Sequence, residues 1–370
     1  MSDRENIRFT RRSLLGASLF AGTSFALKAC GVTTSSTTTS DAASPAGGGS
    51  LIATCFAGSW EQFYRQVLVP AFVKDTGGEA RITPMVSLEQ VAQLTASPQN
   101  PPFDLALLDE GPFNAAAKDE LFEKLPVDLV SNYADVLPEL KNPEGWGPTT
   151  GVQVMGIAYN PKLVSTPPSS WKDLWGSQYR GRVSMQGMKT TQGTSFMVQI
   201  AKLNGGSETD IEPAFQALQE LKPNFAGIAS NAGALATLFQ QEEVVIAPHD
   251  LNNVVALKQK GADIDWVMPK EGGIALRPAQ QIVKNTSVDP KLAAAFINAA
   301  LSTEVQQAMA SEPYYFVPSN GNVSLSGLLE EKLGSNSAAK VLEKLVLLNW
   351  NEINKNRTEW IERFDREVQV

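Results

Sequence analysis

Carboxylates that follow short apolar runs are the residues of this chain best suited to chemistry. Asp109 comes directly after one such run, Asp250 follows another, and Glu271 lies in a Pro-Lys-Glu-Gly turn. Ionised carboxylates make their strongest hydrogen bonds with charged donors such as ammonium groups. These three side chains therefore predict a site for a small cation, with a helix-capping or surface role as the alternative for each.

Other polar and aromatic candidates lie in the loops after predicted strands or in the long central strand. An indole ring can stack on a methylene chain or offer its face to a cation, while hydroxyl and amide groups donate and accept hydrogen bonds. We predict a ligand site made of Ser59, Trp60, Asp109, Glu110, Gln153, Gln186, Thr194, Asp250, Glu271 and Arg277, with Thr190 and Thr191 beside them.

Sequence motifs of enzymes are missing. The chain has no G-x-S-x-G elbow, no P-loop and no dinucleotide fingerprint. Its single histidine, His249, is expected to be a loop residue with satisfied hydrogen bonds rather than a general base. One histidine and two cysteines cannot build a thiolate zinc cage or a histidine cluster. We predict no catalysis, no metal site and no cofactor.

Composition and charge also limit the function. The 370 residues are 43% hydrophobic and 19% charged, which is typical of a soluble globular protein. The net charge of −8 excludes nucleic acid as a partner, because the phosphate backbone requires clustered Lys and Arg. An acidic protein suits a cationic solute, although surface charge that aids solubility explains the same number.

The N-terminal segment, residues 1–29, has the pattern of an export signal rather than of a folded element. The run T-R-R-S-L-L at residues 10–15 resembles a twin-arginine signal. A weakly apolar stretch over residues 14–27 follows, and it is too short for a permanent membrane span. We therefore expect export by the twin-arginine route.

The residues after the signal predict a lipid anchor and a tether. The run L-K-A-C at residues 27–30 resembles a lipobox, although Lys28 stands where a small residue is usual. We expect Cys30 to be lipidated and residues 31–50, rich in Ser, Thr, Ala and Gly, to form a flexible tether. Cys55 then has no disulfide partner and should be a small buried side chain. The protein would lie in the periplasm or at the outer face of the cytoplasmic membrane.

The rest of the chain alternates strand and helix patterns, which predicts parallel α/β sheets with a ligand at the carboxyl ends of the strands. The predicted strands are 51–56, 80–86, 104–108, 152–159, 183–185, 244–247 and 264–267. The predicted helices are 59–75, one from Ser87 onward, 171–175, 193–203, 211–221, 231–240, 251–259, 290–301 and 304–310. After Val283 the chain is expected to return to the first of two lobes.

Several short motifs carry a resemblance to a known family. G-x-x-Y-N-P at 156–161, P-x-S-W-x-D-L-W at 168–175 and Y-R-G-R-V at 179–183 resemble the crossover of the bacterial extracellular solute-binding proteins, in the branch of the spermidine/putrescine-binding proteins. Similar motifs follow the family's order at Ala71-Phe72, Thr76-Gly77, Phe103-Asp104-Leu105, Pro269-Lys270-Glu271-Gly272, Phe296-Ile297-Asn298 and Pro318-Ser319-Asn320. The resemblance spans about residues 51–320.

This resemblance implies an α/β fold of two lobes with a hinge and a ligand cleft between them. The first lobe is expected to comprise 51–150 and 270–320 and the second 151–269, with 321–370 as function-free helices on the outside. It also implies a monomer that captures a small solute and delivers it to an ABC permease and its ATPase. A ligand-sensing receptor domain is the alternative from another class of function.

The chemical nature of the solute is left open by two residues or pairs. Arg277 stands where the polyamine-binding members place a Trp-x-Asp pair, so it favours a carboxylate or phosphate on the solute, or it points to solvent. Tyr314-Tyr315 resembles the phenolate pair of iron-binding relatives, but it lies near the returning segment, where packing is the simpler role. A cationic, polyamine-like solute is the first prediction, and an anionic or zwitterionic solute or ferric ion is the alternative.

Overall fold

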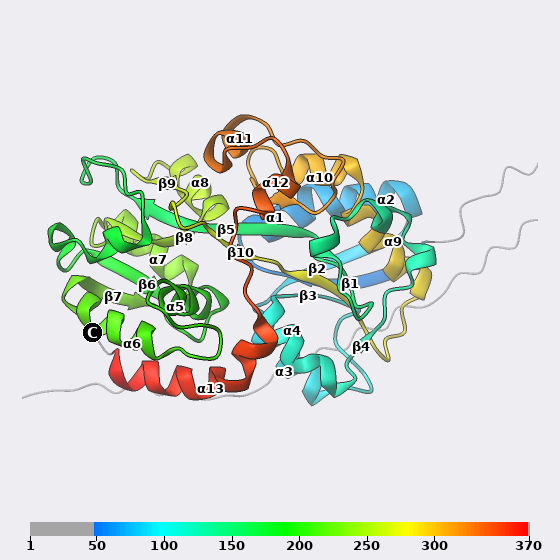
Figure 1. The fold of residues 1–370 in the computed structure, drawn as a ribbon. Helices are drawn as coiled ribbons and strands as arrows, with labels where there is room; N and C mark the ends of the chain where they lie inside the picture. Colours follow the sequence, from blue (N-terminus) through cyan, green and yellow to red (C-terminus); the bar gives the residue numbers. More distant parts are fainter. Residues whose placement is uncertain (1–47, 369–370) are drawn as a thin grey trace, which may run out of the picture. The chain divides into compact units, whose positions relative to one another are not determined.

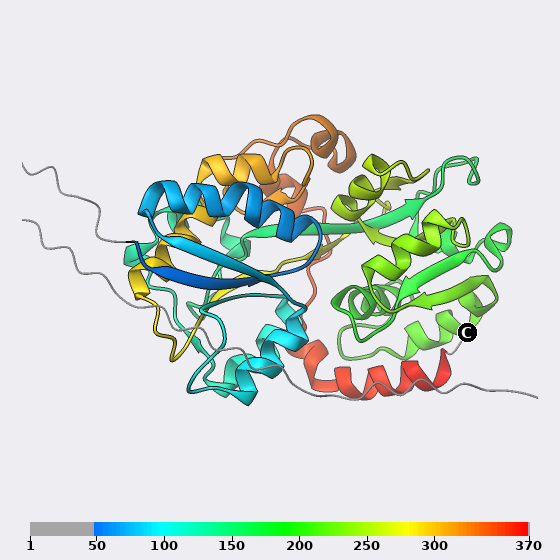
Figure 2. The same ribbon diagram turned by 180° about the vertical axis from the view of Figure 1, so that it is seen from behind.

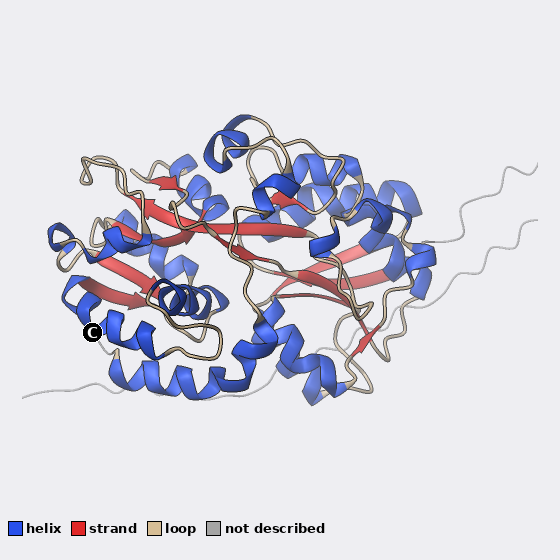
Figure 3. Ribbon diagram, in the orientation of Figure 1, coloured by secondary structure: helices blue, strands red, loops and turns tan. Residues whose placement is uncertain are grey.

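The computed structural model describes residues 48–368. Two β-sheets surrounded by helices form two lobes, which confirms the predicted α/β class (Figures 1 and 3). The predicted signal and Cys30 lie outside the described residues, as does most of the predicted tether, although Ser50 already belongs to the first strand. Within residues 48–368, no helix has the length and apolar character that a membrane span requires.

The first sheet has five strands and is mixed rather than purely parallel. Its order is β2 (Glu79–Pro84), β1 (Ser50–Cys55), β3 (Leu105–Leu108), β11 (Ala279–Val283) and β4 (Phe122–Glu123). β1 pairs in parallel with β2 and β3, as the alternating pattern predicts. β11 runs antiparallel to β3, because it enters from the other lobe without a crossover helix. The return to this lobe therefore begins at Ala279, before the predicted Val283.

The second sheet has seven strands. Its main path is β10 (Ile274–Leu276), β5 (Gly151–Tyr159), β8 (Ile246–Asp250), β6 (Val183–Gln186) and β7 (Phe225–Ala229), while β9 (Asp265–Val267) and β12 (Val317–Pro318) also pair with β5. Each partner of β5 runs antiparallel to it. All nine residues of β5 are buried, which explains its continuous apolar run. In Figure 1 β5 is the long strand that links the two groups of strands.

The predicted helices are confirmed, with ends that differ by a few residues. The first lobe contains α1 (Ser59–Phe63), α2 (Val69–Thr76), α3 (Ser87–Ala96), α4 (Glu110–Ala116), α9 (Pro290–Ala300) and α10 (Thr303–Met309). The second lobe contains α5 (Thr191–Leu203), α6 (Glu212–Leu221), α7 (Ala232–Gln240) and α8 (Leu251–Gln259). The C-terminal region contributes α11 (Gly327–Leu333), α12 (Ala338–Leu342) and α13 (Trp350–Glu367).

Two helix starts illustrate how local sequence sets the structure. Between α1 and α2 a π-helical turn, Tyr64–Leu68, precedes Pro70, which has no N–H to donate to the preceding turn. The predicted short helix Trp171–Trp175 is a 3₁₀ helix with a capping box. Ser170 Oγ accepts from Lys172 N, and the Asp173 carboxylate accepts from Ser170 N at 3.0 Å.

Two buried residues give opposite outcomes for the sequence predictions. Cys55 is a free, fully buried thiol in β1, as predicted, and burial raises its pKa to about 12. The prediction for His249 was wrong, because this residue lies inside strand β8 and is 1% exposed. Neither ring nitrogen has a hydrogen-bond partner among residues 48–368. Burial lowers the pKa of His249 to about 4, so its ring is neutral at physiological pH.

Candidate functional site

Asp109 connects the two lobes at the start of α4. It follows β3 directly, so it lies at the carboxyl end of a parallel strand, where ligand sites form. Its Oδ2 atom accepts a hydrogen bond from Ser87 Oγ at 3.2 Å in its own lobe. The same atom accepts from Thr191 Oγ1 at 2.8 Å in the other lobe. Burial raises the pKa of Asp109, and these two hydrogen bonds oppose that rise.

Asp250 is the corresponding carboxylate of the second lobe. It is the last residue of β8, is fully buried, and precedes α8. Its Oδ2 atom accepts from Asn253 Nδ2 at 3.1 Å and from Gln192 Nε2 at 3.4 Å. Its Oδ1 atom has no partner among the described residues. Burial, with a further contribution from the charge of Asp109, raises the pKa of Asp250 to about 7.

Both carboxylates are held by the first turn of α5. Thr191 reaches Asp109, and its neighbour Gln192 reaches Asp250. The positive end of a helix dipole stabilises negative charge at this position. We refer to Asp109 and Asp250 as the interlobe carboxylates. Neither forms a salt bridge with a cationic side chain within residues 48–368.

A row of amide hydrogen bonds extends from Asp250 to the first lobe. Trp60 Nε1 donates to Gln153 Oε1 at 3.1 Å, and Gln153 Nε2 donates to Asn252 Oδ1 at 3.3 Å. Asn252 Nδ2 then donates to Asn253 Oδ1, and Asn253 contacts Asp250. Trp60 and Gln153 are buried, at 2% and 6% exposure. The row brings three predicted residues together, one from each lobe and one from β5.

Arg357 of α13 is a functional candidate that the sequence prediction missed. It is 8% exposed, and its Nε atom donates to Thr194 Oγ1 at 3.1 Å. Thr194 and Thr191 lie one helical turn apart on α5, so Arg357 and Asp109 contact the same helix face. Burial lowers the pKa of Arg357, and the charge of Asp109 opposes this change. The helical periodicity of the C-terminal segment does not indicate that one of its positively charged side chains, Arg357, lies near the interlobe carboxylates.

Gln186 supplies a second free polar atom. It is the last residue of β6 and is 4% exposed. Its Nε2 atom has no partner among residues 48–368. β6 and β8 are neighbouring parallel strands, so Gln186 and Asp250 both end strands at the same edge of the sheet. One edge thus carries a free donor and a free acceptor.

Glu110 and Arg277, two predicted ligand residues, bind each other. Arg277 Nη2 donates to Glu110 Oε1 at 2.5 Å and Arg277 Nε to Glu110 Oε2 at 3.0 Å, a bidentate ion pair. The two side chains are 16% and 20% exposed. Burial raises the pKa of Glu110 to about 7, although the guanidinium of Arg277 opposes that rise, so the hydrogen bonds rather than the pKa distinguish Glu110 from Asp250. Both charges are already compensated within the protein.

The remaining predicted residues are placed differently. Glu271 accepts from Ser170 Oγ at 2.5 Å and from Trp171 N at 3.2 Å, so it fastens the crossover helix and does not contact the interlobe carboxylates. Ser59 is the first residue of α1 and is partly buried. Tyr314 donates to Gln66 Oε1 and packs on Phe63 within the first lobe. No group of three His, Cys, Asp or Glu in the described part of the chain is arranged to hold a metal ion.

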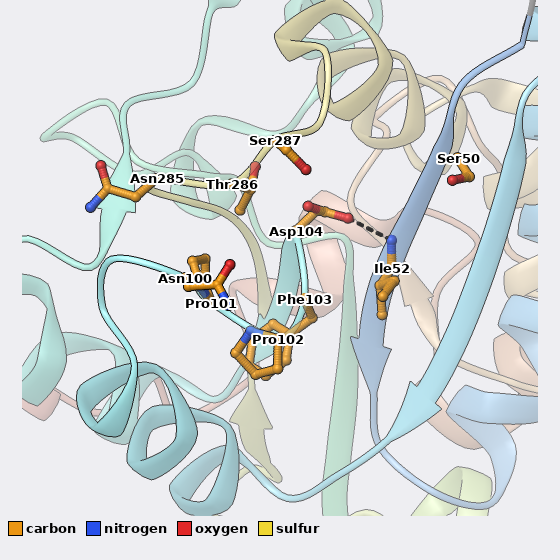
Figure 4. A pocket seen from close by; sticks show the side chains of 10 residues that line it. All are labelled: Ser50, Ile52, Asn100, Pro101, Pro102, Phe103, Asp104, Asn285, Thr286 and Ser287. Carbon is orange, nitrogen blue, oxygen red and sulfur yellow. Dashed lines mark hydrogen bonds between the residues drawn. The ribbon is translucent and has the colours of Figure 1, made fainter.

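Two surface pockets are separate from the interlobe carboxylates. The first, about 330 Å³, lies in the first lobe between the chain before β3 and the turn after β11 (Figure 4). It is lined by Ser50, Ile52, Asn100, Pro101, Pro102, Phe103, Asp104, Asn285, Thr286 and Ser287, none of them a predicted ligand residue. In it, Asp104 Oδ2 accepts from the backbone N–H of Ile52 at 2.7 Å. The second, about 300 Å³, contains Glu110 and Arg277 among its lining residues.

Two α/β lobes joined by β5, with buried carboxylates at strand ends where the lobes meet, are the architecture of proteins that bind a small ligand between two lobes. Residues 100–356 match the family model of the bacterial extracellular solute-binding proteins. The chain belongs to this family, which confirms the resemblance seen in the sequence. The family match covers more than half of the chain, including the second sheet and the part of the first lobe that follows α3.

Comparison with known proteins gives the same picture. The chain is 26% identical over 280 residues to the spermidine/putrescine-binding periplasmic protein of Escherichia coli, covering 72% of this chain and 77% of that protein. It is 27% identical over 208 residues to a Salmonella typhimurium protein that is named for 2-aminoethylphosphonate binding, covering 55% of this chain and 58% of that protein. The crystal structure of an ABC transporter from Clostridium perfringens superposes with a TM-score of 0.71 at 24% identity, covering 86% of this chain and 100% of the other.

Proposed function

We propose that this protein is the solute-binding component of an ABC-type importer and captures a solute that carries an ammonium group. A polyamine-like cation is the first candidate. The lobes would close on the solute, and the closed protein would present it unchanged to a membrane permease driven by an ATPase. The observation that carries this proposal is Asp250, a fully buried carboxylate with an unpartnered oxygen beside a second carboxylate.

The physical argument is one of unmet charge. A buried ionised carboxylate costs free energy unless it is paired. Burial raises the pKa of Asp250 to about 7 and so favours its protonated, uncharged form. An ammonium group placed between Asp109 and Asp250 would supply the missing charge and up to three donors. The nearby indole of Trp60 is fully engaged with aromatic neighbours and Gln153, so its contribution would be shape rather than a free cation–π face.

A zwitterionic solute is the second candidate, and Arg357 is the observation that favours it. A buried guanidinium beside Asp109 would repel a polycation but attract a carboxylate or phosphonate. The free amide of Gln186 would add a neutral donor to the same anion. The relative from Salmonella typhimurium is named for 2-aminoethylphosphonate, a solute that carries both charges, and it supports this choice. Ferric ion has no comparable support in the described residues.

We further propose export by the twin-arginine route and lipid attachment at Cys30, which would hold a monomeric binding domain near its permease. These proposals rest on the sequence motifs at residues 10–15 and 27–30. For the lobes we propose boundaries of 51–150 with 270–320, and 151–269. The strand order favours one change, because β10 pairs in the second sheet and β11 in the first, which would move the second boundary to about Arg277. A lipid-sensitive mobility shift that disappears in Cys30→Ser would test the anchor.

The decisive experiment is a thermal-shift and calorimetry screen of the purified protein. Spermidine, putrescine, 2-aminoethylphosphonate, 4-aminobutyrate, inorganic phosphate and ferric citrate would be compared at one ionic strength. Ligand at about 100 times its dissociation constant adds roughly 2.7 kcal/mol to the free energy of unfolding, enough to move the midpoint by several degrees. A shift with the polyamines supports the first candidate, and a shift only with the zwitterions supports the second. Absence of a thermal shift with every ammonium compound would refute the proposed cation site.

Transport and sensing make different predictions in cells. Deletion of a transport component abolishes uptake of radiolabelled solute, whereas deletion of a sensing domain leaves uptake intact and changes gene expression. We expect loss of uptake. An enzyme would convert the bound compound, so recovery of unaltered solute from the heat-denatured complex distinguishes binding from turnover.

A further inference from the structure

Helix α13 is attached firmly to the second lobe by one of its faces. Ile353, Trp360 and Phe364 are buried in the hydrophobic core that contains α5 and α6. Arg363 forms a bidentate ion pair with Glu212 of α6, with Nη1–Oε2 at 2.5 Å and Nη2–Oε1 at 3.2 Å. In Figures 1 and 2 the C-terminal part of the red helix α13 lies beside α6. α13 is therefore a structural part of the second lobe.

The N-terminal end of the same helix also contacts the first lobe. Trp350 and Asn354 lie one turn apart there, beside the buried stripe of α13 that also contains Ile353 and Arg357. Asn354 Nδ2 donates to the backbone oxygen of Gly111 in α4 at 2.8 Å. The ring of Trp350 covers the Cα atom of the same glycine: a Cβ built there would lie 2.6 Å from Trp350 Cε3 and Cζ3. We refer to Gly111, Trp350 and Asn354 as the closure seam.

The closure seam adjoins the interlobe carboxylates. Gly111 is two residues beyond Asp109, in the first turn of α4. That turn contacts α5 through the Asp109–Thr191 hydrogen bond and α13 through Gly111. Arg357 joins the two contacts, because it binds Thr194 of α5 and lies over the ring of Trp350 at 5.4 Å. Movement of the first lobe away from the second would break both contacts together.

The glycine is the feature that permits this close approach. Real Cβ atoms essentially never approach a neighbour within 3.0 Å, so no larger residue fits at this position while α4 lies against Trp350. Gly111 is the second residue of α4. Its backbone φ angle is not in the left-handed region, so the missing side chain, not the backbone conformation, is what this position requires.

We propose that Gly111 is a positioning residue for ligand capture and that the lobes close through the seam between Gly111 and the Trp350–Asn354 face of α13. This inference rests on the proposed function, in which the lobes close on a solute. It assigns the C-terminal helix a role in closure. The solute is recognised by the interlobe carboxylates, and the seam sets how tightly the first lobe seats against the second.

The test is Gly111→Ala, compared with a matched glycine variant and a rescue variant. Gly227→Ala is the matched control, because a Cβ at Gly227 has no heavy atom within 4 Å. Gly111→Ala combined with Trp350→Ala removes the ring that the new methyl group would meet. Small-angle X-ray scattering of the full chain measures lobe separation without any ligand, and calorimetry with spermidine and 2-aminoethylphosphonate measures capture.

We expect Gly111→Ala to increase the radius of gyration and to weaken binding at least tenfold, with an unfolding midpoint equal to or above that of the parent protein. Gly227→Ala should match the parent, and the double variant should regain the smaller radius. Scattering of Gly111→Ala identical to that of the parent would overturn the proposal. Scattering needs no ligand, so expansion in Gly111→Ala supports the closure seam whether or not the parent protein binds either ammonium compound. Failure of the parent protein to bind both compounds would refute the proposed solute class and not the seam.

Discussion

The interlobe carboxylates and the Glu110–Arg277 pair differ in how the protein compensates the charge of a carboxylate. Asp109 and Glu110 are neighbours in the sequence, yet Glu110 is held by a guanidinium in a bidentate ion pair, whereas Asp109 and Asp250 receive only neutral donors. A carboxylate whose counter-ion is built into the protein stabilises the fold and has little affinity left for a solute. A buried carboxylate without one is the group that we propose meets the cation of the solute. Position in the sequence alone does not distinguish the two.

The largest expected effect is on the Glu110–Arg277 pair. Arg277→Ala leaves a mostly buried carboxylate uncompensated, and removing one partner of such a pair costs roughly 3 kcal/mol of unfolding free energy. Affinity for an ammonium solute should change less than twofold. Urea denaturation and calorimetry on the same sample measure both quantities. The double variant Glu110→Leu with Arg277→Met serves as the control and should regain most of the stability, and a loss of affinity in Arg277→Ala would place this pair in the ligand site.

Asp250→Asn should have the opposite profile. It removes the charge that we propose meets the ammonium group, which costs roughly 1.5 to 3 kcal/mol of binding, or about 10- to 100-fold in affinity. The free energy of unfolding should stay equal or rise, because a buried carboxyl group whose charged form is disfavoured is replaced by an amide. Calorimetric titration measures the affinity of each variant for the solute. Unchanged affinity in both Asp250→Asn and Asp109→Asn would eliminate a cation between the lobes.

The pKa of Asp250 makes capture depend on pH. With a pKa of about 7, this carboxyl group is protonated below pH 7, and binding of a cation must then release that proton. Affinity should rise up to about tenfold per pH unit between pH 5 and 7 and level off above pH 7. Calorimetry in buffers with different ionisation enthalpies counts the released proton. The profile should become flat in Asp250→Asn and persist in Glu110→Gln, and a flat profile in the parent protein would contradict the assignment.

The smallest effect is expected at Glu271. Its carboxylate is already engaged with Ser170 and Trp171, so Glu271→Gln should lower the unfolding free energy by about 1 kcal/mol and leave affinity within twofold. Thermal unfolding and calorimetry measure the two changes. A tenfold loss of affinity with intact stability would return Glu271 to the ligand site, and it would show that local hydrogen bonds are a poor guide to ligand residues in this protein.

The sequence was a good guide wherever a pattern is local. The apolar run that became β5 and the helical periodicity of α5 were predicted closely. The sequence also indicated that Asp109 and Asp250 lie at the ends of strands, and their role as ligand residues stays a prediction. The short strands β4, β10 and β12 carry no recognisable alternation, since each has only two or three residues. Their place in a sheet depends on pairing with distant segments.

The parts of the site that could not be predicted depend on contacts across long sequence separations. Glu110 and Arg277 are 167 residues apart, and nothing near either of them indicates the ion pair. Arg357 meets Thr194 from 163 residues away, on a helix whose sequence shows only an amphipathic pattern. A prediction by residue type therefore collects candidates but cannot tell which charges are already compensated.

The strand order also predicts which of the two sheets forms first during folding. The second sheet draws β10, β5, β8, β6, β7 and β9 from one continuous stretch of chain, whereas the first sheet needs β11, which follows β3 after the whole second lobe. Contacts between distant segments carry a larger loop-closure entropy and form later. Most of the second sheet can therefore assemble first, before β12 and α13 are added to it, and the first sheet stays incomplete until its returning strand arrives. Pulse-labelling hydrogen exchange during refolding should show β5 and β8 protected before β3.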